Sequence, residues 1–175
     1  MGCARSGRYT RFLCTAGALA LICPVSAAER IEQTFVKENF RVITKSAVQI
    51  GDAPDHELRQ EVTLGDVTYS DTRFGTTQEL VYLTTDEVAG KGRHRGYFVG
   101  THRDGSQCYG EFEGSTKLVT RPDGSWEATW EGAHRYLSGT GKCKGIEGGG
   151  TYKGSVSPTR PAREEGRETI RFAGN

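Results

Sequence analysis

The chain has 175 residues, a length that suits one domain or one domain plus a processed segment. Its formal net charge of +1 excludes a strongly basic nucleic-acid-binding protein and an acidic disordered tail. Apolar residues make up only 35% of the chain, and its 24 glycines are about twice the usual share.

The first 27 residues have the pattern of a secretory signal peptide. Three arginines and no acidic residue precede an apolar run at residues 12–23. A proline ends the run, and Val25-Ser26-Ala27 then supplies the small-x-small site that a signal peptidase needs. The run is shorter than the roughly 20 residues that span a membrane. We therefore expect an exported protein, periplasmic or secreted, with a mature domain at residues 28–175 and no integral membrane segment in it.

The rest of the chain is typical of an antiparallel β-protein. Most segments alternate with a period of two, and glycine-rich turns separate them. No stretch long enough for a helix keeps helical spacing, and neither a repeat nor a linker divides the chain. We expect strands at Thr34–Ser46, Glu57–Leu64, Glu79–Thr85, Arg93–Arg103, Gln107–Gly114, Thr116–Arg121, Ser125–Glu131, Thr151–Val156 and Glu168–Phe172. Ser157–Gly166, with two prolines and several charges, is expected to be a solvated loop.

The Asp104-Gly105 pair predicts the turn of one hairpin. This pair is typical of a two-residue type I′ turn, because glycine tolerates a positive φ. The resulting register places Thr101 opposite Cys108. The inner face then carries Tyr97, Val99, Thr101, Cys108, Gly110 and Phe112, and the outer face carries His94, Phe98, His102, Gln107, Tyr109, Glu111 and Glu113.

A second hairpin is indicated by Pro122-Asp123-Gly124, which suits a type I turn with a glycine bulge. That turn places Thr116 opposite Trp130. The less charged face should point inward. It carries Thr116, Leu118, Trp126 and Trp130, whereas Lys117, Val119, Arg121, Glu127, Thr129 and Glu131 lie on the outer face.

Eight or nine short antiparallel strands can form a sandwich or a closed barrel. Closure removes strand edges, and an eight-stranded barrel leaves an interior for side chains or for one small ligand. The residues that we expect to line this cavity are Tyr97, Thr101, Phe112, Thr116, Leu118, Trp126 and Trp130. Aromatic rings would form its wall, and threonine hydroxyls would orient a ligand without a buried charge.

Two of the five cysteines, Cys108 and Cys143, lie beyond the predicted leader. In an oxidising compartment such a pair is more often bonded than free, so we predict a disulfide between them. The two cysteines lack the spacing of a zinc site, and the four histidines are scattered along the chain. The pattern therefore indicates no metal and no cofactor.

A glycine motif resembles a known barrel family. The segment from Tyr136 to Gly148, YLSGTGKCKGIEG, resembles the late glycine motif of allene oxide cyclases, and Leu64-Gly65-Asp66 resembles a tripeptide of their early strands. Dirigent proteins carry a similar Gly-Thr-Gly segment. The resemblance implies a closed or nearly closed, cup-like, eight-stranded antiparallel barrel with a mainly apolar cavity, in which the glycines bend the chain across the barrel end. Oligomers are common among such proteins.

Catalytic residues are not carried over from this family. Cys143 stands where the family usually has an aromatic residue, and the catalytic acid of the plant enzymes aligns with no position of this chain. The chain has no nucleophile elbow, P-loop or His-Glu-x-x-His motif. His56 suits a polar turn as well as a site. Glu111 becomes an acid–base candidate only if its register slips by one residue, which would turn it inward.

Three functions fit these features, and we rank binding first. In the first, the barrel binds a small apolar molecule without turnover. In the second, it is a cofactor-free isomerase or cyclase whose cavity folds a reactive substrate. In the third, it is a structural or host-interaction module with a filled barrel. A cavity group with a strongly shifted pKa would favour the enzyme, and a cavity filled by Trp126 and Trp130 would favour the third function.

Overall fold

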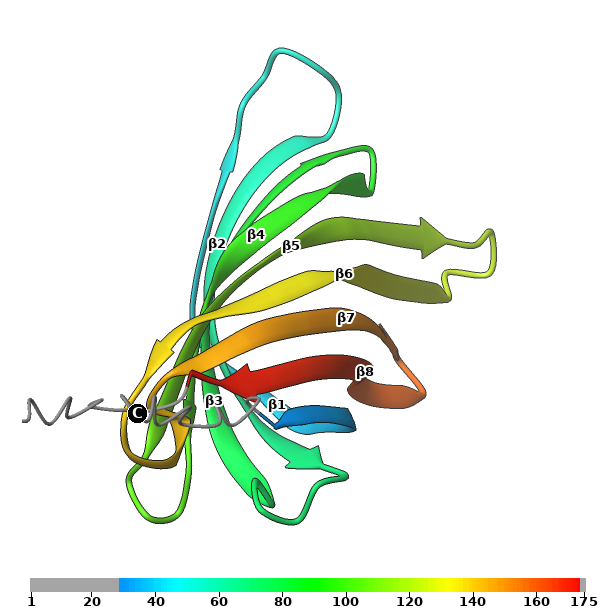
Figure 1. Cartoon of the computed structure of the whole chain (residues 1–175). Coiled ribbons are helices and arrows are strands. Elements are labelled where there is room, and N and C mark those ends of the chain that lie inside the picture. Colours follow the sequence, from blue (N-terminus) through cyan, green and yellow to red (C-terminus); the bar gives the residue numbers. More distant parts are fainter. Residues whose placement is uncertain (1–28, 174–175) are drawn as a thin grey trace, which may run out of the picture.

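Eight antiparallel strands form one closed barrel (Figure 1). The computed structural model describes residues 29–173, so the predicted leader at residues 1–27 lies outside the described part. Each strand pairs with its neighbours in sequence, and the last strand pairs with the first. The elements are β1 (Arg30–Gln49), β2 (His56–Tyr69), β3 (Thr76–Val88), β4 (Lys91–Thr101), β5 (Gln107–Thr120), β6 (Trp126–Gly139), the short 3₁₀ helix η1 (Gly141–Cys143), β7 (Ile146–Ser157) and β8 (Arg160–Phe172). The predicted all-β, eight-stranded barrel is confirmed.

The segment Ser157–Gly166 is not the loop that its prolines suggested. Only a tight turn separates β7 from β8, and β8 begins at Arg160. Pro161 is tolerated in this strand because β8 pairs with β1 only from Glu164 onward, so the missing N–H of Pro161 removes no bond from that ladder. The structure also joins the predicted strands Gln107–Gly114 and Thr116–Arg121 into the single long strand β5.

The turn between β4 and β5 corrects the predicted register of the first hairpin. The amide of His102 donates to the carbonyl of Ser106, and the loop between them holds three residues rather than two. A type I′ turn needs a positive φ at both central residues, but of Asp104 and Gly105 only the glycine (φ +82°) has one. Thr101 therefore pairs with Gln107 rather than with Cys108. This shift of one residue turns every β4 side chain to the opposite face.

The second hairpin has the predicted register. Thr116 pairs with Trp130, Leu118 with Ala128 and Thr120 with Trp126. Gly124 adopts a φ of +80°, and the amide of Arg121 donates to the carbonyl of Ser125 across the turn. A type I turn with a glycine bulge was thus the right turn type for this connection, and the same type also occurs between β4 and β5.

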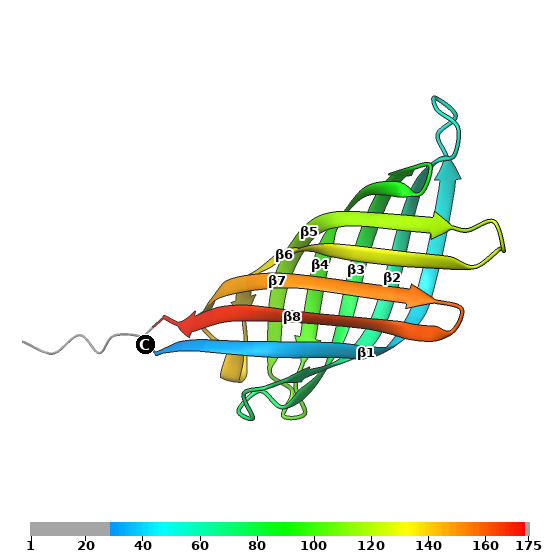
Figure 2. The same ribbon diagram turned by 90° about the vertical axis from the view of Figure 1, so that its right-hand side faces the viewer.

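One end of the barrel is closed by packed side chains. The β2–β3, β4–β5 and β6–β7 connections all lie at this end, together with the start of β1 and the end of β8 (Figure 2). The glycine-rich segment after β6 crosses here and carries Cys143, which is fully buried. The core of this end comprises Ile31, Phe74, Val81, Phe98, Cys108, Tyr136, Cys143, Ile146 and Ile170. The interior of the barrel is therefore closed at this end.

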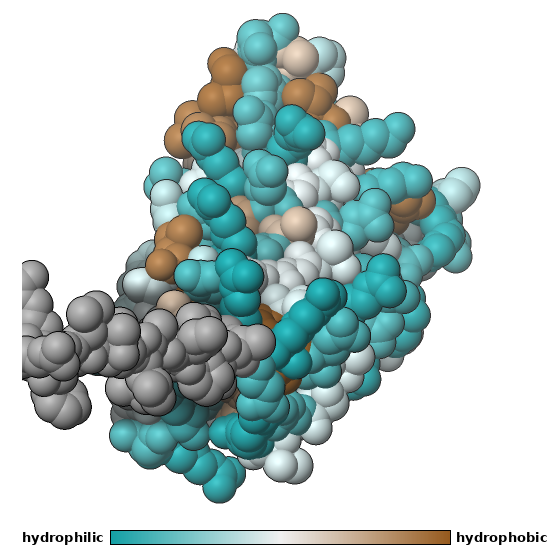
Figure 3. All heavy atoms as spheres, viewed as in Figure 1, coloured by the Kyte–Doolittle hydropathy of each residue, from teal (hydrophilic) through white to brown (hydrophobic). Residues whose placement is uncertain are grey.

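The opposite end is open because β1 parts from β8. The two strands pair only as far as Lys37 and Glu164, and Asn39 then adopts a φ of +57° beside an irregularity in the β1–β2 ladder. Beyond this point β1 follows β2 alone, and their hairpin projects in a different direction from the β5–β6 hairpin (Figures 1 and 2). Exposed aliphatic side chains gather on the projecting hairpin (Figure 3): Val42, Ile43, Val48 and Ile50.

Glycines inside the barrel make room for large rings. A Cβ added at Gly110 would lie 2.1 Å from the ring of Phe98, and one added at Gly154 would lie 2.2 Å from the indole of Trp130. In both places a ring of one strand lies over the glycine of its partner strand. The high glycine content of the chain thus follows in part from fitting aromatic side chains into a narrow barrel.

Candidate functional site

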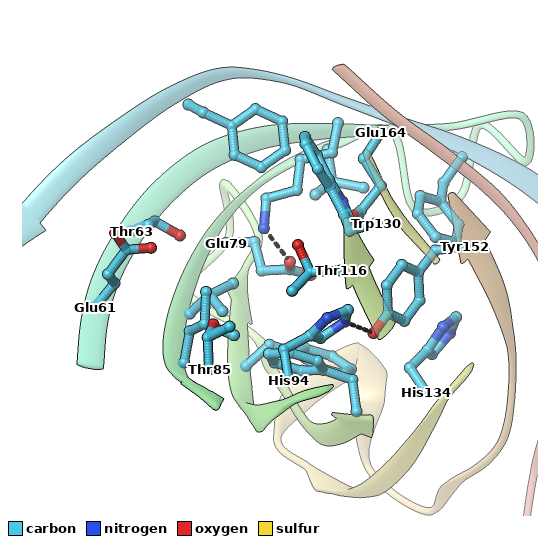
Figure 4. A pocket seen from close by; sticks show the side chains of 18 of the residues that line it. Glu61, Thr63, Glu79, Thr85, His94, Thr116, Trp130, His134, Tyr152 and Glu164 are labelled. Carbon is cyan, nitrogen blue, oxygen red and sulfur yellow. Dashed lines mark hydrogen bonds and ion pairs between the residues drawn. The ribbon is translucent and has the colours of Figure 1, made fainter. Parts of the chain in front are cut away.

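A cavity of about 280 Å³ lies between the closed end and the open mouth of the barrel (Figure 4). Every strand contributes to its wall. The aromatic part of the lining consists of Phe35, Phe40, Tyr69, Phe98, Phe112, Trp130, Tyr136 and Tyr152, and the titratable part consists of Lys37, Arg59, Glu61, Glu79, His94, His134, Glu164 and Glu168. The lining surface is mainly apolar, as the resemblance implied, but it includes buried charged groups that the sequence analysis did not expect.

Lys37 and Glu79 form an ion pair within the wall. The Lys37 Nζ lies 2.7 Å from a carboxylate oxygen of Glu79, and the two side chains are only 4% and 14% exposed. A Cβ at Gly65 would lie 2.8 Å from the Lys37 Cε, so this glycine gives the lysine stem its space. The ammonium also lies 5.1 Å from the centre of the Phe40 ring, a favourable cation–π distance. The pair is therefore held by contacts on several strands.

Glu164 differs from the other carboxyls of the cavity lining, because Glu61, Glu79 and Glu168 form ion pairs and Glu164 forms none among the described residues. The Trp130 Nε1–H donates to one of its oxygens at 2.6 Å, and among the described residues Glu164 has no second side-chain hydrogen bond. Burial raises the pKa of Glu164, although the positive charge of Lys37 and the Trp130 hydrogen bond partly oppose the shift. The second oxygen of this carboxyl is thus a polar group that can receive a ligand.

Glu168 is, by contrast, fully occupied by protein donors. Its carboxylate accepts hydrogen bonds from Gln33 Nε2 at 2.6 Å, His134 Nε2 at 2.9 Å and the Tyr136 hydroxyl at 3.1 Å. Burial and the nearby negative charge of Glu168 contribute to raising the pKa of Tyr136, which keeps its hydroxyl protonated as a donor. The cluster around this satisfied carboxylate forms a polar floor between the cavity and the closed end.

His94 and Tyr152 form a second polar pair in the wall. The His94 Nε2 lies 2.7 Å from the Tyr152 hydroxyl, which also lies 3.3 Å from the carbonyl oxygen of Glu113 (Figure 4). Burial lowers the pKa of His94, so the ring is neutral near pH 7. The predicted position of His94 on the outer face was wrong, and the corrected β4 register explains why it faces inward.

The mouth of the cavity carries a charge network. Arg59 on β2 lies 3.2 Å from Glu57, 3.5 Å from Glu61 and 3.8 Å from Glu87, and Lys45 approaches Glu61 at 3.4 Å. Because these groups are largely paired with one another, they give the entrance a polar rim without a strong net field.

Three of the seven expected cavity residues, Phe112, Thr116 and Trp130, line the cavity. Leu118 is exposed, and neither it nor the half-buried Trp126 belongs to the lining. Tyr97 and Thr101 were assigned to the wrong face, and Tyr97 is 58% exposed on the outer surface.

Further polar groups of the lining were not singled out from the sequence, among them Lys37, Glu79, His134, Glu164 and Glu168. The outer position of Glu111 agrees with the expectation, because its carboxylate pairs with Arg135 on the exposed face. His56 lies in a polar turn region, where its ring contacts Asp52 and Asp86. The hydrogen bonds to these two carboxylates raise the pKa of His56.

The predicted disulfide between Cys108 and Cys143 is present at the closed end. It links β5 to η1. His102 lies against both sulfur atoms, with its Nε2 at 3.4 Å from Cys108 Sγ and 3.5 Å from Cys143 Sγ. Burial lowers the pKa of this histidine, and the positive charge of Lys142 acts in the same direction. His102 was expected on the outer face but is 3% exposed, because the corrected register turns it inward.

Comparisons with known proteins give no relative for this chain: no family model, no curated protein and no solved structure matches it. Its similarity to allene oxide cyclases and dirigent proteins therefore stays a prediction from the glycine motif. Among residues 29–173, no helix has the length and apolar character that crossing a membrane requires.

Proposed function

We propose that the barrel binds a small, mainly apolar molecule that carries one hydrogen-bonding group. The observation that carries this proposal is the aromatic-lined cavity, which opens at one end and holds Glu164, a carboxyl that accepts one hydrogen bond and has no ion-pair partner among the described residues. Binding sites for small molecules are typically concave and apolar, with a few polar groups that fix the orientation of the ligand. The volume of about 280 Å³ is close to the lower limit of such sites, which favours a compact ligand.

The lining supports a defined orientation of the ligand. Its apolar part would pack against Phe112 and Trp130, whose rings face the cavity. Its polar group would meet the free oxygen of Glu164, which Trp130 holds in place through the indole N–H. When protonated, this carboxyl donates to a hydroxyl or carbonyl oxygen; when ionised, it accepts from a hydroxyl or an amine.

A cavity-filling variant tests this proposal. Ala128 lines the cavity, whereas its neighbour Thr129 is exposed on the other face of β6. N-phenyl-1-naphthylamine, a neutral apolar dye, should bind the wild-type protein saturably at one site and should be displaced by a terpenoid alcohol. Ala128→Phe should abolish binding, and the matched control Thr129→Phe should leave it unchanged. Equal binding by both variants, or no binding by the wild type, would contradict the proposal.

A cofactor-free isomerase is a second candidate, and the raised pKa of Glu164 favours it. A buried carboxyl whose pKa is shifted toward neutrality is suited to transfer a proton to or from a bound substrate. In heavy water such a reaction would introduce deuterium into the ligand, which mass spectrometry detects. The terpenoid that displaces the dye would then acquire deuterium in the presence of the wild-type protein but not in the presence of Glu164→Gln. Simple binding predicts no deuterium in the terpenoid with either protein.

The third candidate, a filled barrel with a purely structural role, has less support. Trp130 lines the cavity without filling it, and Trp126 does not belong to the lining.

Export is part of the proposed function. The signal-peptide pattern of residues 1–27 predicts it, and a disulfide between Cys108 and Cys143 is typical of an oxidising compartment. A protein of this kind would meet its ligand outside the cytoplasm.

A further inference from the structure

We propose that reduction of the Cys108–Cys143 disulfide creates a binding site for one Cu(I) ion, held by the two thiolates and by the Nε2 of His102. This site lies at the closed end of the barrel. It is independent of the ligand cavity and of the function proposed for it.

Three chain segments bring the donor atoms together. His102 follows β4, Cys108 lies at the start of β5, and Cys143 lies in η1 after the glycine-rich crossing. The Nε2 and the two sulfur atoms all lie within 4.8 Å of one another, and all three residues are buried. The spacing of these residues in the sequence does not indicate a metal site, because the fold alone unites them.

The orientation of the His102 ring points to a ligand. Its Nδ1 lies 3.2 Å from the carbonyl oxygen of Phe74, so Nδ1 carries a hydrogen that it donates there. In the neutral ring, Nε2 then presents a bare lone pair, and the atoms facing it are the two sulfurs. Sulfur atoms in a disulfide carry no hydrogen to donate. The oxidised protein therefore leaves a buried acceptor without a donor, whereas a metal ion between Nε2 and two thiolates would satisfy it.

The hydrogen bond from His102 to the Phe74 carbonyl is of the kind that metal-binding histidines usually make. Such histidines donate their second ring N–H to a carbonyl or carboxylate, which fixes the tautomer and the plane of the ring. Phe74 contributes further through its own ring, whose centre lies 6.1 Å from that of His102 and 6.2 Å from that of Phe172. The candidate site is thus buried and has an aromatic ring beside its histidine.

The donor set favours Cu(I) over zinc. Two thiolates and one imidazole form a soft, three-donor set, and soft sulfur ligands select Cu(I). Structural zinc is almost always tetrahedral, and this buried site offers neither a fourth protein donor among the described residues nor space open to water. The complex of Cu(I) with two thiolates carries one negative charge. The positive charge of Lys142 acts on His102 and would offset part of this charge.

The redox step is balanced by a dithiol reductant. The reductant transfers two electrons and two protons to the protein disulfide, which becomes two thiols, while the reductant becomes a disulfide. Cu(I) then replaces both thiol protons, which leave to solvent. In the reverse direction, a small-molecule disulfide takes two electrons from the two thiolates and two protons from solvent and becomes two thiols, while the protein disulfide re-forms, both copper–sulfur bonds break and Cu(I) leaves. The metal affinity of the site therefore depends on the redox state of the protein.

Anaerobic competition between the protein and bicinchoninate for Cu(I) tests this proposal. All proteins carry Cys3→Ser, Cys14→Ser and Cys23→Ser, so that thiols of the predicted leader cannot contribute. Dithiothreitol reduces the disulfide and is then removed by gel filtration under nitrogen. The reduced protein should take up one Cu(I) per chain, and the oxidised protein should take up none.

Substitution of the histidine decides whether the site is the predicted triad. His102→Ala should weaken Cu(I) binding by more than about tenfold. Even the loss of a residue that only hydrogen-bonds to a metal ligand often lowers metal affinity by about that factor, and His102 is itself a proposed ligand. His56→Ala, at the opposite end of the barrel, is the matched control and should bind as the parent does. Equal affinities of the His102→Ala and parent proteins would overturn the proposal, as would an equal affinity of reduced parent and Cys143→Ser. If His102→Ala fails to fold, X-ray absorption of the parent decides: two sulfurs and one nitrogen are expected, and sulfur ligands alone would refute the triad.

Discussion

Breaking the Lys37–Glu79 ion pair should strongly destabilise the barrel. At 2.7 Å the gross attraction between the two charges is about 6 kcal/mol for an effective dielectric constant of about 20. Removing both ions from water costs several kcal/mol each, so the net contribution of the intact pair is small. Lys37→Met nevertheless leaves Glu79 buried and unpaired, and such a loss typically costs about 3–5 kcal/mol.

Urea denaturation followed by circular dichroism measures this effect. Lys153→Met is the matched control, because Lys153 and Glu165 form an ion pair at 3.2 Å whose side chains are 72% and 51% exposed. Loss of this exposed ion pair should lower the free energy of unfolding by no more than about 1 kcal/mol. The double variant Lys37→Met/Glu79→Leu should recover most of the stability lost in Lys37→Met. Similar small losses for Lys37→Met and Lys153→Met would show that the inner pair is effectively solvated and would refute the reasoning.

Three further predictions concern the disulfide, a buried histidine and the leader. Cys143→Ser opens a loop of 35 positions and should lower the unfolding free energy by up to about 4 kcal/mol in urea denaturation; a loss below about 1 kcal/mol would contradict this loop-closure argument. His94 has a lowered pKa in the folded state, so its contribution to stability is full above pH 6.5 and is lost as the pH falls through the folded pKa. At pH 5.5 this loss is at most about 1.4 kcal/mol, and His94→Gln should reduce the pH dependence of the unfolding free energy measured between pH 7.5 and 5.5. An unchanged dependence would contradict this, because it would show that the pKa of His94 is the same in the folded and unfolded protein. Intact-mass spectrometry of the exported protein should find a chain that begins at Ala28 or Glu29, whereas an uncleaved chain in the cytoplasm would contradict export.

The strand pattern and most of the fold could be predicted because period-two alternation and turn residues are local signals. The register of the second hairpin was predicted correctly for this reason, because its Pro-Asp-Gly turn specifies both the loop length and the register. The register of the first hairpin was predicted wrongly because Asp-Gly suits a two-residue turn and also the end of a three-residue turn. A choice between these turns changes the register by one residue and exchanges the two faces of β4.

The polar half of the cavity could not be assigned from the sequence because both faces of several strands carry charges. Glu164 lines the cavity, but Glu165 next to it forms an exposed ion pair. In β1, Lys37 lies on the same face of the strand as the buried Ile31 and Phe35, so the period-two alternation of this segment indicates that the lysine points inward. Its partner Glu79 and the space at Gly65 are contributed by other strands, so the sequence alone does not show how the charge is accommodated.

The central claim is that a small molecule enters the cavity beside Trp130, and a titration of single-tryptophan proteins tests it most directly. The chain has two tryptophans, of which only Trp130 lines the cavity. In Trp126→Phe protein, a terpenoid or fatty-acid-like ligand should cause a saturable shift of the remaining indole fluorescence. In Trp130→Phe protein, whose only indole is Trp126, the same titration should cause no shift. A flat response of the Trp126→Phe protein across chemically diverse apolar ligands, with its fold verified by circular dichroism, would contradict the binding function.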